Sequence, residues 1–164
     1  MRPPTPGQST AFTEDYPAGT RTLTTPVRLG AHLTTGQAWP PSPSADLIAI
    51  WDTGATCSVI TRRLVQAVGL RPISLTTCTG VSGSFETSVY LVSLLLPNGV
   101  CLPQLEVVEA DLGGPEADML IGRDVIGEGD FAVSNFGGKT TLSFRLPAVE
   151  RLDFVATEGG ADRR

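Results

Sequence analysis

The residues best placed to do chemistry in this sequence are Asp52, Thr53 and Gly54, which follow the apolar run 47–51 (LIAIW). A carboxylate at the end of an apolar strand is costly to bury unless it is hydrogen-bonded or used, because burial disfavours its charged form. The Thr53 hydroxyl is able to bond to backbone groups, and Gly54 permits another chain or a substrate to approach closely because it lacks a Cβ atom. Asp and Gly are also common in ordinary turns, so the tripeptide alone does not distinguish a reactive site from a turn.

The elements that must position this carboxylate are short strands and tight turns. Residues 47–51 predict a buried strand, because a continuous apolar run is typical of a strand covered on both faces. Residues 61–68 predict a short helix that begins after the N-cap Thr61 and ends at Gly69. Glycine-flanked turns, such as the one over residues 79–83, separate further strand-like stretches. Seven or more short strands with one clear helix indicate a closed or folded β-barrel.

Length and composition limit the class of protein. The 164 residues fit one compact domain, and with 41% hydrophobic and 18% charged residues the chain is able to build a core. The formal net charge of −5 argues against nucleic acid and against an anionic membrane surface as partners, since both attract clustered cations. The longest nearly apolar run, 89–96, is far too short to cross a bilayer, and residues 1–10 lack the apolar core of a secretory signal. We therefore expect a cytoplasmic protein.

The cysteines and the histidine are too few for a zinc site or a disulfide framework. Cys57, Cys78 and Cys101 are an odd number without CxxC spacing, and His32 has no second histidine to partner it. A structural zinc site needs four converging ligands. We expect the cysteines to be small buried hydrophobes in a reducing compartment, and neither a metal nor an organic cofactor to be bound.

The chain around Asp52 resembles the active-site loop of the retropepsins, the retroviral-type aspartic proteases. In that family a hydrophobic strand runs into Asp-Thr/Ser-Gly-Ala, followed by Ser or Thr and aliphatic residues, as in residues 52–60 here. A second family signature, two apolar residues and a glycine that open a short helix, is similar to residues 120–126 (LIGRDVI). The turn 80–83 (GVSG) lies between the two, where the family carries its flap hairpin. The three elements follow the family's order and cover roughly residues 27–146.

The resemblance implies an all-β fold, the retropepsin-like acid-protease barrel with one or two short helices, whose active site lies at a homodimer two-fold axis. The Pro-, Thr- and Ser-rich composition of residues 1–20 predicts a flexible N-terminal tail. The protease domain would then span residues 21–147. Residues 148–164 would form a C-terminal extension with a frayed end.

The resemblance also assigns roles to residues. Aspartic proteolysis needs two carboxylates that share one proton. Asp118 precedes its apolar run and Asp124 follows a helix-opening glycine, so neither is placed to be the second carboxylate. A homodimer is therefore implied, in which Asp52 and its symmetry mate activate a water, Thr53 locks the paired loops and Gly54 admits the substrate. The expected substrate contacts are Ala55, Thr56, Gly80, Val81, Ser82 and Gly83.

Two positions depart from the family's pattern. Many retroviral enzymes carry acidic residues just after the alanine, whereas this chain has Thr56 and Cys57, which leaves Arg123 without an obvious partner. Neutral contacts there favour apolar or uncharged peptides. The function expected is that of an aspartic endopeptidase acting on peptides or proteins. A catalytically inert binding or assembly module on the same fold, and a self-processing protease that cleaves its own tail, stay open as alternatives.

Overall fold

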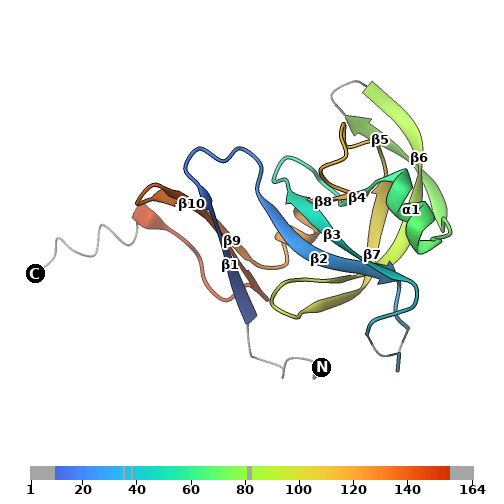
Figure 1. Cartoon of the computed structure of the whole chain (residues 1–164), viewed down its shortest axis with the longest axis horizontal. Coiled ribbons are helices and arrows are strands. Elements are labelled where there is room, and N and C mark those ends of the chain that lie inside the picture. The colour runs from blue at the N-terminus through green and yellow to red at the C-terminus, as the bar shows by residue number, and fades with distance from the viewer. Residues whose placement is uncertain (1–9, 35, 38, 81–82, 156–164) are drawn as a thin grey trace, which may run out of the picture.

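The computed structural model describes residues 10–34, 36–37, 39–80 and 83–155, which form mostly β-strands with two short helices (Figure 1). The all-β fold class expected from the sequence is confirmed. No helix among the described residues has the length and apolar character needed to span a membrane. The elements are β1 Thr10–Pro17, β2 Thr24–Ala31, β3 Ser44–Trp51, β4 Val59–Ile60, α1 Arg62–Val68, β5 Ser74–Gly80, β6 Gly83–Leu95, β7 Cys101–Glu109, β8 Met119–Ile121, α2 Arg123–Ile126, β9 Asp130–Phe136 and β10 Lys139–Leu146.

The larger sheet closes on itself. Its seven strands run in the order β2-β3-β8-β4-β7-β6-β5, and β2 pairs a second time with β6 over residues 28–31. Six strands therefore form a ring, which removes the exposed edges that an open sheet would leave. Only β5 lies outside the ring, paired to β6 alone, so the β5–β6 hairpin projects from the barrel (Figure 1).

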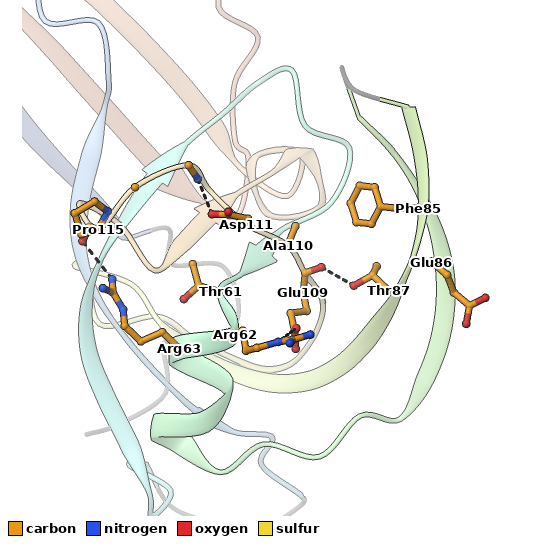
Figure 2. Close-up of a pocket in the computed structure, with 12 residues that line it drawn as sticks. Thr61, Arg62, Arg63, Phe85, Glu86, Thr87, Glu109, Ala110, Asp111 and Pro115 are labelled. Carbon is orange, nitrogen blue, oxygen red and sulfur yellow. Dashed lines mark hydrogen bonds and ion pairs between the residues drawn. The ribbon is translucent and has the colours of Figure 1, made fainter.

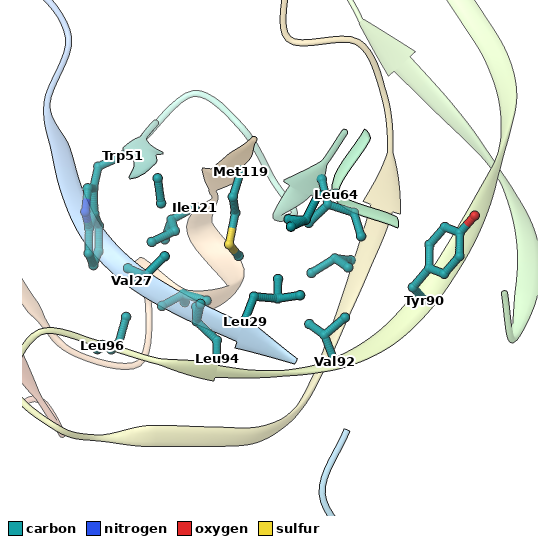
Figure 3. Close-up of a cluster of buried hydrophobic side chains, with 14 of the residues drawn as sticks. Val27, Leu29, Trp51, Leu64, Tyr90, Val92, Leu94, Leu96, Met119 and Ile121 are labelled. Atoms are coloured by element: carbon teal, nitrogen blue, oxygen red, sulfur yellow. The ribbon is translucent and has the colours of Figure 1, made fainter. Parts of the chain in front are cut away.

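The barrel is filled by apolar side chains from every part of the ring (Figure 3). Leu29, Met119 and Ile121 are fully buried at its centre. Helix α1 contributes Leu64 and covers one opening. It begins as predicted, because the Thr61 hydroxyl accepts a hydrogen bond from the backbone N–H of Leu64 at 3.3 Å, and it ends at the left-handed Gly69.

A second, three-stranded sheet of order β1-β10-β9 packs against the end of the barrel at which β3 finishes. The contact is an aromatic cluster in which the Trp51 ring lies 5.9 Å from Phe12, 5.6 Å from Phe131 and 4.9 Å from Phe144, measured between ring centroids. The indole N–H of Trp51 donates to the hydroxyl of the buried Thr25 at 2.9 Å. The last residue before Asp52 is thus held by both sheets.

The predicted tail over residues 1–20 is wrong for Thr10–Pro17, which form β1 and pair with β10 along their whole length. Only alternate residues of β1 are half-buried, among them Phe12 and Tyr16, and the residues between them are exposed. Tyr16 also donates its hydroxyl hydrogen to the carbonyl of Thr24 at 2.6 Å. An edge strand of this kind has a weak apolar pattern, and its partner lies more than a hundred residues away, so composition alone does not reveal it.

Candidate active site

Asp52 directly follows β3, and its backbone is held in place by a neighbouring strand. Trp51 is buried, and the Asp52 N–H donates to the carbonyl of Ile121 on β8 at 3.0 Å. The half-buried carboxylate accepts a hydrogen bond on Oδ1 from the N–H of Gly54 at 2.8 Å. Its Oδ2 atom accepts no hydrogen bond from any residue that the structure describes. One oxygen therefore orients the group and the other is available to a water or a substrate.

Gly54 leaves little room for a side chain at its position. A Cβ atom there would lie 3.1 Å from Asp52 Oδ1, which is tighter than ordinary packing. Thr53 and Gly54 are both exposed, and the Thr53 hydroxyl makes no hydrogen bond within the described chain. The hydroxyl expected to lock two loops together is thus unused inside one protomer.

The loop after Asp52 is braced by the segment at the start of α2. Ser58 is fully buried, its hydroxyl donates to Asp124 Oδ1 at 2.8 Å, and its N–H donates to Asp124 Oδ2 at 2.8 Å. The N–H of Gly122 donates to the same Ser58 hydroxyl at 3.1 Å, and the N–H of Arg123 donates to the carbonyl of Ala55 at 2.8 Å. We call these four hydrogen bonds the Ser58 brace. Asp124 acts here by positioning the loop, a role that sequence reasoning missed.

Gly122 allows the brace to form. A Cβ atom at this residue would lie 2.5 Å from both the carbonyl carbon and the carbonyl oxygen of Cys57, which is shorter than the nonbonded contacts that Cβ atoms make. Glycine is needed because two backbone segments touch here, not for a left-handed conformation. The Arg123 side chain is exposed and forms no ion pair within the described residues, which agrees with the missing acidic partner.

A cleft of about 910 Å³ lies between the Asp52 loop and the β5–β6 hairpin. Residues 54–57 of the loop form one wall, and residues 76–80 of β5 form the opposite one. Val59 and Leu120 add apolar surface to it. The structure therefore brings together Gly54, Ala55, Thr56 and Gly80 of the predicted site. Sequence reasoning did not assign Val59 or Leu120 to it, although each lies within one of the two family signatures.

The hairpin over this cleft has the form expected of a flap. Gly80 pairs with Gly83 at its tip, and the hydroxyls of Thr79 and Ser84 are hydrogen-bonded at 2.9 Å just below. Gly83 has a φ of +117°, which strains any side chain, but Gly80 does not have a positive φ. The predicted contacts Val81 and Ser82 lie outside the described residues.

The three cysteines are free and half-buried, not fully buried as expected. Cys57 and Cys78 both line the cleft, one from each wall. Burial, followed by the neighbouring Cys78 and Asp124, raises the pKa of the Cys57 thiol. Neither residue was assigned to the site from the sequence.

A second hollow of about 770 Å³ lies beside α1 and meets the cleft at Phe85 (Figure 2). Two of its charged groups are paired: Arg62 donates to Glu109 Oε1 at 2.8 Å, and Tyr90 donates to Glu109 Oε2 at 2.8 Å. The hydrogen bond from Arg62 lowers the pKa of Glu109, and the partial burial of the carboxyl opposes this only in part. The hollow thus contains a clamp between α1 and β7.

The comparison with known proteins agrees with this geometry. The sequence profile of the aspartyl protease family matches residues 44–125, half of the chain, from the start of β3 into α2. No curated protein matches the chain in sequence. Among solved structures, a retropepsin-like aspartic protease from Rickettsia conorii superposes with a TM-score of 0.52 and 12% identity, over 85% of this chain and 96% of that one.

Two other solved structures are similar to a smaller extent. EIAV protease, complexed with the inhibitor HBY-793, is 24% identical with a TM-score of 0.49, over 65% of this chain and 86% of that one. The retroviral protease-like domain of Ddi1 from Leishmania major is 18% identical with a TM-score of 0.44, over 74% of this chain and 93% of that one. From the family match, and from the fold that it shares with the Rickettsia structure, the chain belongs to the aspartyl protease family and has the retropepsin-like fold.

Proposed function

We propose that this protein is an aspartic endopeptidase that is active as a homodimer. The observation that carries the proposal is the single Asp52 carboxylate, which is oriented through Oδ1, open at Oδ2 and located beside a cleft under a hairpin. The catalytic residues are Asp52, Thr53 and Gly54. No metal or organic cofactor takes part in this reaction scheme.

The chemistry needs two carboxylates, and each chain supplies one at this position. In the dimer, the ionised Asp52 takes a proton from a water as its oxygen attacks the peptide carbonyl carbon, while the protonated Asp52 of the other protomer donates to the carbonyl oxygen. The tetrahedral intermediate then breaks its C–N bond as the amide nitrogen receives a proton from the dyad. Two carboxylates held close ionise in two separated steps, so activity is highest in acid, between these steps, and falls toward alkaline pH.

The substrate contacts in this proposal are residues of the loop and of the flap. Ala55 and Thr56 face the peptide from below. Gly80, Val81, Ser82 and Gly83 are the contacts proposed for the flap. The neutral residues 54–57 and 76–80 favour apolar or uncharged peptides, because a charged side chain would lose its hydration against them without gaining a partner.

We assign the dimer contact to the outer edge of β9. Trp51 stacks on Phe131 with 23° between the ring planes, so β9 lies beside the strand that carries Asp52. Strand β9 pairs with β10 on one side and has no strand partner on the other within the described residues. Val133 and Phe136 on it are 44% and 89% exposed. A two-fold axis along this edge covers unpaired backbone groups and exposed apolar surface, and brings the two Asp52 loops together.

We also propose that the domain runs from β1 to residue 147, and that the protein works in a reducing compartment such as the cytoplasm, where its three thiols stay free. The peptidase proposal is tested by incubating the purified chain with a peptide library from acid to neutral pH, beside Asp52→Asn. Cleavage by the wild type and none by the variant is expected. A folded, dimeric wild type that cleaves nothing would favour the inert binding module, and an active Asp52→Asn would exclude this mechanism.

A further inference from the structure

Two cysteines meet across the cleft although they belong to elements that must move apart. Cys57 lies on the Asp52 loop, and Cys78 lies on β5, two residues before Gly80 at the flap tip. Both line the cleft, and Cys78 is among the groups that act on the Cys57 thiol. Cys101, the third cysteine, opens β7 and does not line the cleft. The proposed mechanism uses none of the three.

We propose that Cys57 and Cys78 form a reversible oxidation site, in which a peroxide converts the two thiols into a disulfide that ties the flap to the active-site loop. A disulfide needs its two Cβ atoms about 3.8 Å apart. Two neighbouring thiols that face the same cleft from its two walls are placed to form this bond as the walls approach each other. The third cysteine has no such neighbour among the groups that contact it, so one pairing is favoured over the other two.

The reaction balances with hydrogen peroxide as the oxidant. The thiolate of one cysteine attacks a peroxide oxygen, the O–O bond breaks, and a sulfenic acid forms as hydroxide leaves and takes up a proton. The second thiol then attacks the sulfenic sulfur and displaces a second water. Two thiols and one peroxide therefore give one disulfide and two waters, and a dithiol reductant reverses the change by exchange.

Reduced and oxidised forms would differ in whether the cleft opens. A flap over a peptide cleft has to lift to admit its substrate. A covalent bond between β5 and the loop holds the two walls together at one end of the cleft, so a peptide chain cannot pass between them. This consequence for turnover rests on the proposed peptidase function, whereas formation of the disulfide does not.

The surroundings of the pair suit a switch more than a permanent crosslink. Cys57 is half-buried, and because burial raises its pKa, little of it is thiolate at neutral pH. The pair therefore stays reduced until an oxidant is supplied. Both thiols are partly exposed along the cleft, so a molecule as small as hydrogen peroxide reaches them.

The test treats the purified full chain with hydrogen peroxide and compares wild type, Cys57→Ser, Cys78→Ser and Cys101→Ser. Intact-mass and peptide mapping are expected to find a Cys57–Cys78 crosslink, with the loss of two hydrogens, in the wild type and in Cys101→Ser. The two other variants should form no such crosslink. A linkage through Cys101, a crosslink between two chains on a non-reducing gel, or oxidation that stops at sulfinic acid would each overturn the site.

The effect on turnover is read in the same samples. Peptide cleavage by the wild type and by Cys101→Ser should be lost on oxidation and return with dithiothreitol, whereas the ratio of rates before and after peroxide should stay near one in Cys57→Ser and Cys78→Ser. A crosslinked protein that cleaves as fast as the dithiol form would overturn the proposed effect of the disulfide on turnover. If the reduced protein cleaves nothing, the peptidase proposal fails, and the mass measurement alone still decides whether the oxidation site exists.

Discussion

Removing the hydroxyl at the centre of the Ser58 brace should loosen the Asp52 loop without changing any group that touches substrate. Ser58→Ala deletes a hydrogen bond to a carboxylate, and it leaves the buried N–H of Gly122 without its acceptor. A hydrogen bond to a charged group contributes about 1.5–3 kcal/mol, and an unsatisfied buried donor costs about 1–3 kcal/mol. These two effects share one site and are not additive, so we expect a loss of about 2–4 kcal/mol in the free energy of unfolding.

Ser93→Ala is the matched control. Ser93 is as fully buried as Ser58, but its hydroxyl makes one hydrogen bond, to the carbonyl of Ala31 at 2.8 Å, on the far side of the barrel. Its loss should cost about 1 kcal/mol. Both variants exchange a hydroxyl for a hydrogen in a packed site, so the difference between them isolates the brace.

The assay is urea and thermal unfolding at one fixed protein concentration, together with kcat and KM for a cleaved peptide. Ser58→Ala should lower the melting temperature by roughly 4–16 °C, since each kcal/mol is worth about 2–4 °C in a domain of this size. Its kcat should fall, because the loop that the brace holds positions the Asp52 carboxylate. Equal losses of stability in Ser58→Ala and Ser93→Ala, or an unchanged kcat in Ser58→Ala, would refute the role given to the brace.

Three further predictions address the flap, the dimer and the acid limb of stability. Gly83→Val should cripple cleavage, because φ is +117° there, and it should change dimerisation and melting temperature little, because the position is open to solvent. Gly80→Ala, at an ordinary φ, should have a milder effect on cleavage. Equal rates in the wild type and both variants would show that this hairpin is not the flap. Phe136→Asp should shift sedimentation from dimer to monomer and abolish cleavage, and a dimeric variant would place the interface elsewhere. Glu109 has a pKa lowered from 4.5, so its stabilising effect is complete above that value and is lost as the pH falls through the lowered pKa. Urea unfolding over a pH series should therefore show a shallower acid loss in Glu109→Gln than in wild type, and parallel curves would contradict the clamp with Arg62.

Local chemistry made part of this fold predictable. The run 47–51 predicts the strand that ends at Asp52, and Thr61 and Gly69 mark the ends of α1, because each signal depends on neighbours within a few residues. The glycine-flanked turn near residue 80 likewise predicts a hairpin. The resemblance of residues 52–60 and 120–126 to two family signatures, with the turn between them, predicted the retropepsin-like fold, which the structural comparison confirms.

The contacts between residues far apart in the sequence were decided by the tertiary structure. Strand β1 was mistaken for a tail because its partner β10 is more than a hundred residues away and only one of its faces meets the core. Ser58 and Asp124 are 66 residues apart, and neither residue type indicates that it will hold the other. Cys57 and Cys78 meet only because the ring closes and places the β5–β6 hairpin over the Asp52 loop. Propensity and periodicity act over a few residues, so a short segment of sequence is enough to detect them. Contacts between distant segments depend on strand register and on closure of the barrel, and no short segment of sequence contains that information.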